Sequence, residues 1–148
     1  MRLTTFTDYS LRVLIYLGAR PEKRARIADV AAAFAISENH LVKVVHFLGK
    51  EGLLETTRGH GGGMRLAVAP ERINIADVVR RTEGGDVPAE CFEPDNHRCV
   101  IAGDCRLRGV LQEAVAAFYS VLAHYSLADL VRDRAALAKL LFPVSGVF

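Results

Sequence analysis

The apolar residues of the first fifty positions recur at intervals of three and four, which is the spacing of amphipathic helices. The pattern predicts a helix over 7–18, with Thr7 as its N-cap, and a short alanine-rich helix over 27–36. A third helix over 37–52 begins at Ser37, which is a second N-cap residue. Two short helices joined by a turn of three or four residues form a helix-turn-helix, so we expect this motif over 27–52.

Polar side chains occupy the outward face of the third helix, opposite its apolar residues. Asn, His and Lys near a helix N-terminus are suited to reach base edges and phosphates in a DNA major groove. The outward residues are Glu38, Asn39, His40, Lys43, His46 and Lys50. We take Asn39 and His40 as candidates for base contacts, Lys43 for phosphate affinity, and Ser37 as a further DNA-binding residue. An ordinary solvated helix face would carry the same residue types, so this pattern alone leaves the choice open.

A β-hairpin is predicted directly after the third helix. Residues 53–57 and 64–67 have strand character, and the glycine-rich turn 58–63 joins them. A hairpin in this position is the wing of a winged helix-turn-helix, and its glycines let the backbone approach a phosphate or a minor groove closely. The glycine spacing fits neither of the common nucleotide-binding patterns, and no strand-to-helix context surrounds it. The DNA-contact candidates of the hairpin are Arg58, His60 and Arg65.

The second half of the chain predicts three more helices. One covers 73–82, and the last runs over 127–141 after the N-cap pair Ser126 and Asp129. Between them, apolar residues are spaced four, three, four, three and four apart, which is a heptad seam. The seam residues are Leu107, Leu111, Ala114, Phe118, Val121 and Tyr125. We expect this helix to pair with a second copy of the chain, although a helix packed on its own domain would carry a similar seam.

These elements predict a mainly α fold in three parts. A winged helix-turn-helix domain covers 1–82, a polar loop covers 83–105, and a dimerisation helix with a C-terminal helix covers 106–142. The composition, with 51% hydrophobic residues and 24% charged residues, allows a buried core. The longest apolar runs are far shorter than the roughly 20 residues that span a bilayer, so no membrane span is expected.

The net charge of +2 is divided unevenly along the chain. Residues 1–66 hold ten Lys and Arg against six Asp and Glu, a net of +4, whereas 67–148 hold nine against eleven, a net of −2. This asymmetry suits a head that binds a polyanion on a neutral or acidic body.

All three cysteines lie in the polar loop: Cys91, Cys99 and Cys105, with seven and five residues between them. The N-terminus lacks a secretory signal, so we expect a cytoplasmic location, where thiols stay reduced. An odd number of cysteines also argues against a disulfide framework. Clustered thiols in a reducing compartment favour metal or cofactor binding.

Four uses of these thiols are open. Structural zinc prefers spacers of two to four residues and fits poorly, although His97 would complete a set of three cysteines and one histidine. A thiol-dependent enzyme would use Cys105 as nucleophile and His97 as base, but it leaves the winged head without a role, so we expect no enzyme. An iron–sulfur cluster accepts thiolates from an open loop, with another residue in place of a fourth cysteine. The three cysteines could also be unrelated to one another.

Five segments of the chain resemble the iron–sulfur winged-helix repressors of bacteria, and in particular the members that sense nitric oxide. They lie at the start of the chain, in the recognition helix, in the wing, around the last cysteine and near the C-terminus. The segments are 3–12, 37–45, 58–66, 102–107 and 125–130. The resemblance extends over nearly the whole chain.

The resemblance implies a homodimeric repressor that binds an inverted-repeat operator and releases it when the cluster is nitrosylated or lost. It implies that the three cysteines bind the cluster, as [4Fe–4S] rather than [2Fe–2S], with Asp8 of the other subunit as the fourth ligand. The first cysteine spacer is longer than this family leads us to expect, so four loop residues stay open as alternative ligands: Glu90, Glu93, Asp95 and His97. A regulator of cluster supply or general redox state, and a zinc-stapled dimer without a sensor, are the alternatives.

Overall fold

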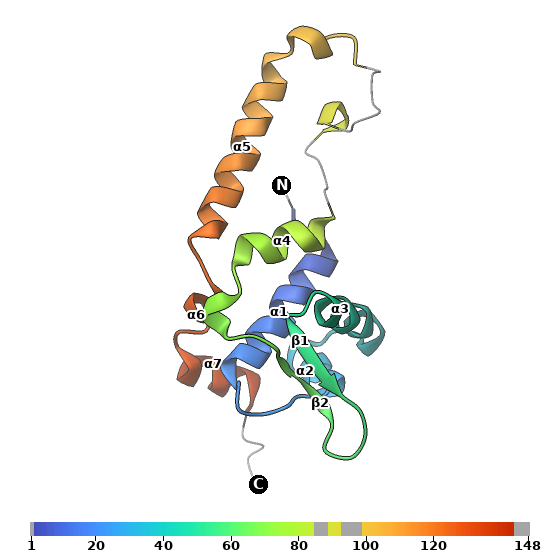
Figure 1. The fold of residues 1–148 in the computed structure, drawn as a ribbon, viewed down its shortest axis with the longest axis vertical. Coiled ribbons are helices and arrows are strands. Elements are labelled where there is room, and N and C mark those ends of the chain that lie inside the picture. Colours follow the sequence, from blue (N-terminus) through green and yellow to red (C-terminus); the bar gives the residue numbers. More distant parts are fainter. Residues whose placement is uncertain (1, 85–88, 93–98, 144–148) are drawn as a thin grey trace.

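The computed structural model describes residues 2–84, 89–92 and 99–143, and its described part is mainly helical with one two-stranded sheet (Figure 1). The helices are α1 (Thr5–Ala19), α2 (Ile27–Phe34), α3 (Glu38–Lys50), α4 (Ile75–Glu83), α5 (Arg106–Ala123), α6 (Leu127–Leu130) and α7 (Arg134–Leu141). The strands are β1 (Leu54–Thr57) and β2 (Gly63–Leu66). Three short 3-10 turns are η1 (Pro70–Arg72), η2 (Glu90–Phe92) and η3 (Ala102–Asp104). The predicted mainly α, winged helix-turn-helix fold is confirmed.

Helix α1 runs through the middle of the molecule, between α3 and the hairpin on one side and α6 and α7 on the other (Figure 1). Its N-cap is Thr4, whose side-chain oxygen accepts a hydrogen bond from the backbone N–H of Thr7 at 3.2 Å. The prediction of Thr7 as the cap was therefore wrong by one turn. The physical reason is that the Thr7 side chain is completely buried and its hydroxyl bonds to α4 instead.

The helix-turn-helix forms where the sequence predicts it. Helix α2 ends at Ala35, which adopts a left-handed conformation at φ 53°, and Ser37 stands at the N-cap position of α3. One face of α3 enters the core through Leu41, Val44, Val45 and Leu48, all of them buried. The helix ends at Lys50, slightly earlier than the predicted end at residue 52.

The wing is an antiparallel pair in which Leu54 lies opposite Leu66 and Thr57 opposite Gly63. A short segment before α2 extends this sheet, because Ala25 and Met64 exchange two backbone hydrogen bonds of 2.8 and 2.9 Å. This bridge could not be predicted from the sequence, since a single extended residue has no periodicity. It fixes the base of the wing to the start of the helix-turn-helix.

The single helix predicted over 127–141 is two helices. The capping box at Ser126 and Asp129 is present as predicted, but α6 stops at Leu130 and Asp133 caps a new helix by accepting from the Ala136 N–H at 2.9 Å. The break allows Val131, which is 1% exposed, to enter the core while α7 turns to pack on α1.

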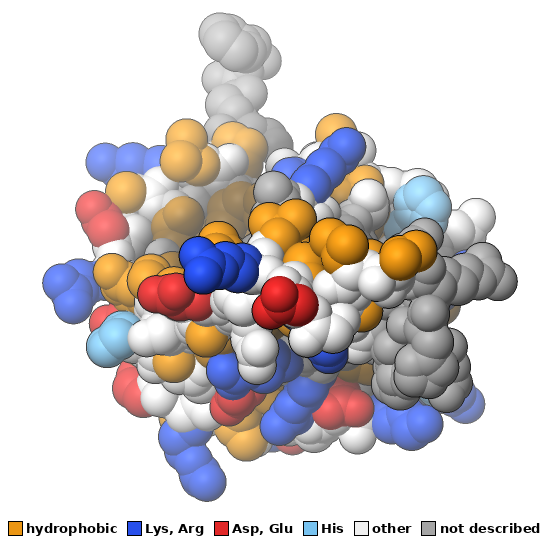
Figure 2. All heavy atoms as spheres, turned by 90° about the horizontal axis from the view of Figure 1, so that it is seen from above, with side chains coloured by type: hydrophobic (Ala, Val, Ile, Leu, Met, Phe, Trp, Pro, Cys, Tyr) orange, Lys and Arg blue, Asp and Glu red, His pale blue; other side chains and the backbone are white. Residues whose placement is uncertain are grey.

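Helix α5 projects well beyond the head. Its N-terminal end is the far one, its C-terminal end lies at the head near α6, and it contacts α4 (Figure 1). None of its residues is fully buried in the single chain. Several large apolar side chains on it and beside it are more than half exposed: Val100, Ile101, Leu107, Val110 and Val121. Figure 2 looks onto this end of the molecule and shows apolar side chains gathered at the surface. Within the described ranges, no helix is both long and apolar enough to span a membrane.

Two glycines of the head predict opposite effects of an alanine. At Gly63, where φ is 148°, an added Cβ would lie 2.7 Å from the carbonyl oxygen of Ala25, so Gly63→Ala should lower the free energy of unfolding by roughly 2 kcal/mol or more. At Gly49, inside α3, the atom nearest to an added Cβ is 3.9 Å away, so Gly49→Ala should raise the free energy of unfolding by about 0.5–1 kcal/mol. Urea unfolding of both variants checks the pair, and a destabilised Gly49→Ala would contradict the packing of α3.

Candidate functional site

The outward side of α3 carries a stripe of polar residues that are exposed to solvent. Asn39, Lys43, His46 and Lys50 lie opposite the buried face, because residues three and four apart share one side of a helix. His40 is exposed but lies to one side, with its ring 6.1 Å from that of Tyr9 in α1. His46 was in the predicted outward set but not among the DNA-contact candidates, although helical spacing alone places it on the same face as Asn39, about two turns further on.

The turn before α3 and the tip of the wing hold three further candidates. The Ser37 side chain is exposed and makes no capping hydrogen bond. Arg58 and His60 are exposed in the loop between β1 and β2, where the Gly62 N–H donates to the Gly59 carbonyl at 3.0 Å. The tip therefore presents one cation and one imidazole on a tight, glycine-bounded turn.

Arg65, the third DNA-contact candidate of the hairpin, does not lie at the tip of the wing with Arg58 and His60. It lies in the middle of β2, opposite Glu55, and its guanidinium donates to Glu55 Oε1. Arg24 donates to the same oxygen at 2.8 Å. These hydrogen bonds, from Arg65 first and then Arg24, hold the pKa of Glu55 below its ordinary value. Arg65 is thus already paired within the chain.

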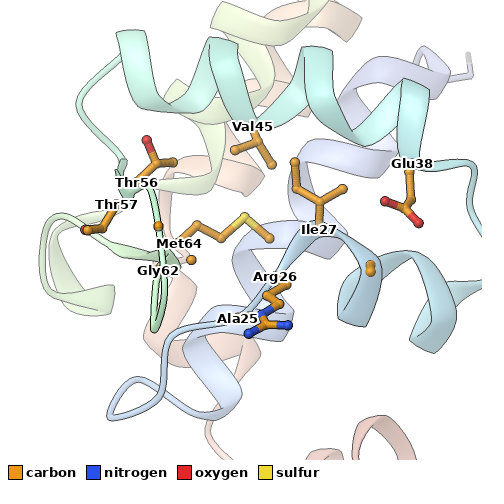
Figure 3. Close-up of a pocket in the computed structure, with 12 residues that line it drawn as sticks. Ala25, Arg26, Ile27, Glu38, Val45, Thr56, Thr57, Gly62 and Met64 are labelled. Carbon is orange, nitrogen blue, oxygen red and sulfur yellow. The ribbon is translucent and has the colours of Figure 1, made fainter.

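A hollow of about 410 Å³ separates α3 from the wing. Figure 3 shows the side chains of Ile27, Val45 and Met64 directed into it, with Thr56 and Thr57 on the wing side. The lining mixes apolar groups, two hydroxyls and the side chains of Arg26 and Glu38, so it selects no particular small molecule. The hollow therefore lies between the start of α2, α3 and the wing.

The three cysteines are free thiols at different places around the polar loop. Cys91 lies in η2 and is half-buried, Cys99 is exposed, and Cys105 is half-buried at the N-cap of α5. Residues 93–98, with the candidates Glu93, Asp95 and His97, lie outside the described residues, as does the side chain of Glu90.

Asp8 lies apart from the cysteines, on the surface of α1. Its carboxylate binds the Arg12 guanidinium through two contacts of 2.9 and 3.1 Å, and its side chain is 45% exposed. It borders a shallow hollow of about 320 Å³ with Arg2, Leu3 and Thr5. Within residues 2–84, 89–92 and 99–143 of one chain, no three His, Cys, Asp or Glu side chains lie close enough together to hold a metal ion.

The chemistry of the thiols nevertheless fits a bound metal cluster. All three are free of disulfides and at least partly accessible, which thiolate ligands require. Cys105 stands at the N-terminus of an 18-residue helix, and the positive end of the helix dipole suits an anionic ligand set. The exposed side chains of Val100 and Ile101 follow Cys99 directly and would supply apolar cover for such a group.

Comparisons with known proteins agree with these features. A model of the Rrf2 family, described as iron-dependent transcriptional regulator, matches residues 3–133. Over 142 residues, the chain is 49% identical to the HTH-type transcriptional regulator NsrR of Bacillus subtilis and 52% identical to NsrR of Geobacillus kaustophilus. Each match covers 95% of this chain and 97% of the relative.

Solved structures with the same fold include the oxidised form of CymR from Staphylococcus aureus, with a TM-score of 0.71 at 24% identity, over 88% of this chain and 96% of that one. IscR of T. potens has a TM-score of 0.70 at 22% identity, covering 90% of this chain and 88% of its own. At these identities the structures show the fold alone.

The Glu55 ion pairs predict an acid-sensitive contribution to stability. Because the folded-state pKa is lowered, this contribution is fully present above the pKa of an unfolded glutamate, about 4.3, and is lost as the pH falls through the folded-state pKa. The difference in thermal midpoint between the natural protein and Glu55→Gln should stay constant from about pH 7 to 5 and shrink below about pH 4. The same series on the exposed Glu71→Gln is the control, and a difference at Glu55 that is no larger than that at Glu71 at about pH 7 would contradict the pairing.

Proposed function

Because the chain belongs to the Rrf2 family of iron-dependent transcriptional regulators, we propose that it is a homodimeric DNA-binding repressor that senses nitric oxide through an iron–sulfur cluster. The observation that carries this proposal is the place of the three free thiols. They lie between a winged helix-turn-helix head and a projecting helix with exposed apolar side chains. The relatives in the comparison are named as transcriptional regulators, which supports a regulator rather than an enzyme.

DNA binding uses two elements of the head, α3 and the wing. The outward stripe of α3 enters a major groove, where Asn39 and His46 reach base edges and Lys43 contributes phosphate affinity. His40, beside Tyr9, contacts the DNA from the edge of this helix, and Ser37 adds a hydroxyl before it. Arg58 and His60 reach the backbone or the minor groove from the wing. In a symmetric dimer, two such heads read an inverted repeat with half-sites about 34 Å apart.

Dimerisation uses the apolar side of α5. In the single chain, Leu107 and Val121 of the predicted seam are 61% and 59% exposed, and Tyr125 just beyond the helix is 48% exposed. Leaving such residues in water is unfavourable by roughly 1.5–3 kcal/mol each relative to full burial. A second copy of α5 packed along the seam would cover them, as in a coiled coil.

The residues that would hold the cluster are Cys91, Cys99 and Cys105 of one subunit with Asp8 of the other. The loop residues Glu90, Glu93, Asp95 and His97 are the alternatives to Asp8. A [4Fe–4S] cluster, preferred to [2Fe–2S], would supply iron that nitric oxide attacks, and a carboxylate ligand leaves one iron more open than a thiolate does. To act as a ligand, the Asp8 carboxylate would give up its ion pair with Arg12. The cytoplasm keeps such thiols reduced, and we place the protein there.

Arg58 and Arg65 form a matched pair for the DNA-binding surface. Arg58→Ala should reduce the magnitude of the slope of log affinity against log salt concentration by about two for the dimer, because each subunit loses one phosphate contact. Arg65→Ala should change the slope less, since that guanidinium already donates to Glu55 within the chain. Gel shifts at several salt concentrations, on DNA selected from random duplexes, measure both slopes. A larger loss at Arg65 than at Arg58 would contradict the assigned roles.

The sensing step is tested on anaerobically purified protein. It should be brown, contain iron and sulfide, and lose operator affinity at least tenfold after nitric oxide is added, a change of about 1.4 kcal/mol or more. A colourless protein with one bound zinc ion would contradict the proposal and favour the zinc-stapled dimer. Affinity that responds to cluster removal but not to nitric oxide would instead favour a regulator of cluster supply or redox state.

A further inference from the structure

Two of the three buried polar side chains in the described part of the chain hydrogen-bond to each other. Thr7, Ser10 and Thr82 are the buried polar residues, and Ser10 donates only within its own helix, to the Phe6 carbonyl. The Thr7 hydroxyl instead donates across to Thr82 Oγ1 in α4 at 2.8 Å. Thr82 in turn donates to the Val78 carbonyl at 2.9 Å. A buried hydroxyl pair therefore joins the first turn of α1 to the last turn of α4.

Glu83, the last residue of α4, adds two hydrogen bonds to this junction. Its Oε1 accepts from the backbone N–H of Thr4 at 2.9 Å and from the Thr4 hydroxyl at 3.1 Å. Thr4 is the N-cap of α1, and its hydroxyl also lies 3.0 Å from that of Thr7. One carboxylate oxygen thus holds the end of α1 by main chain and side chain together. We call the four residues Thr4, Thr7, Thr82 and Glu83 the α1–α4 clamp.

The clamp lies where three functional parts of the chain meet. Gly84, in a left-handed conformation, is the C-cap of α4, and Cys91 follows it seven positions later in the sequence. Asp8 directly follows Thr7 in the clamped turn of α1. On another side of the same turn, the Phe6 ring packs edge to face on Phe47 of the recognition helix, with ring centres 5.3 Å apart.

We propose that Glu83 and Thr82 are positioning residues for Asp8, because they clamp the first turn of α1 to the end of α4 from which the cysteine loop departs. This inference rests on the proposed function. In the proposed dimer, Asp8 binds the partner's cluster. In each subunit the clamp therefore connects the start of that subunit's cysteine loop to the aspartate that the subunit supplies to its partner. The two cluster sites of a dimer are thereby coupled, and loss of one loosens the ligand of the other.

Hydrogen exchange of the metal-free protein tests the clamp without cluster or DNA. Glu83→Ala should raise exchange of the amides in residues 4–8 by roughly tenfold, because the Thr4 N–H loses its acceptor. Glu83→Gln keeps a side-chain oxygen at the same position and should retain slow exchange. Glu71→Ala, an exposed glutamate in η1, is the matched control. Should Glu83→Ala fail to fold, Thr82→Val serves in its place, because it replaces the buried hydroxyl that accepts from Thr7 with a methyl group of similar size.

A double-mutant cycle on the cluster-loaded protein tests whether the clamp acts through Asp8. Glu83→Ala should change the rate of the absorbance loss with nitric oxide by about threefold or more in the natural background, and by little in the Asp8→Ala background. Unchanged exchange, an unchanged rate in the natural background, or equal rate changes in both backgrounds would each overturn the inference. A colourless natural protein would instead overturn the proposed function and the inference with it, which separates the two failures.

Discussion

The burial of α1 in the middle of the core is the constraint on which the rest of the structure depends. Val13, Leu14 and Leu17 of this helix are almost completely buried, and each buried apolar side chain contributes about 1.5–3 kcal/mol. Gly18 permits the close approach of α6, since an added Cβ would lie 3.2 Å from a methyl group of Val131. Because α2, α3, α4, α6 and α7 all pack on α1, this helix cannot shift without disturbing the helix-turn-helix.

This arrangement divides the described residues into a well-packed head and a less tightly packed part that holds the cysteines. The recognition helix and the base of the wing are tied into the core through Leu41, Leu48 and Met64. The described parts of the cysteine loop, and helix α5, contribute no fully buried side chain. A cluster held only by the loop would have no firm connection to the head. Asp8 supplies that connection in our proposal, because it belongs to the most constrained helix and faces outward.

The sequence predicted those parts of the fold that depend on local pattern. The helix-turn-helix, the hairpin and the Ser126 capping box follow from helical spacing, glycine turns and side-chain caps, and all are present. The misplaced cap at Thr7 and the break at Val131 depend on tertiary burial, which a local pattern does not contain. A threonine that bonds to another helix looks the same in sequence as a threonine that caps its own.

The candidate site divides in the same way. Exposure of Asn39, Lys43 and Arg58 was predictable from their positions in a helix and a turn. The pairing of Glu55 with Arg65 and Arg24 depends on strand register and on a residue 31 positions before Glu55, so the sequence could not show it. The proposed ligand set is also not visible in one chain, because its described residues bring no three His, Cys, Asp or Glu side chains together.

The origin of the fourth ligand tests the central claim, that α1 of one subunit completes the cluster site of its partner. The measurement is the visible absorption and nitric-oxide reaction rate of a heterodimer, isolated through two different tags. One subunit carries Asp8→Ala, and the other carries Cys91→Ser, Cys99→Ser and Cys105→Ser. If Asp8 crosses between subunits, the intact loop meets the intact aspartate, and the cluster reacts at the natural rate. If the heterodimer reacts like the Asp8→Ala homodimer, the aspartate does not cross and the claim is wrong.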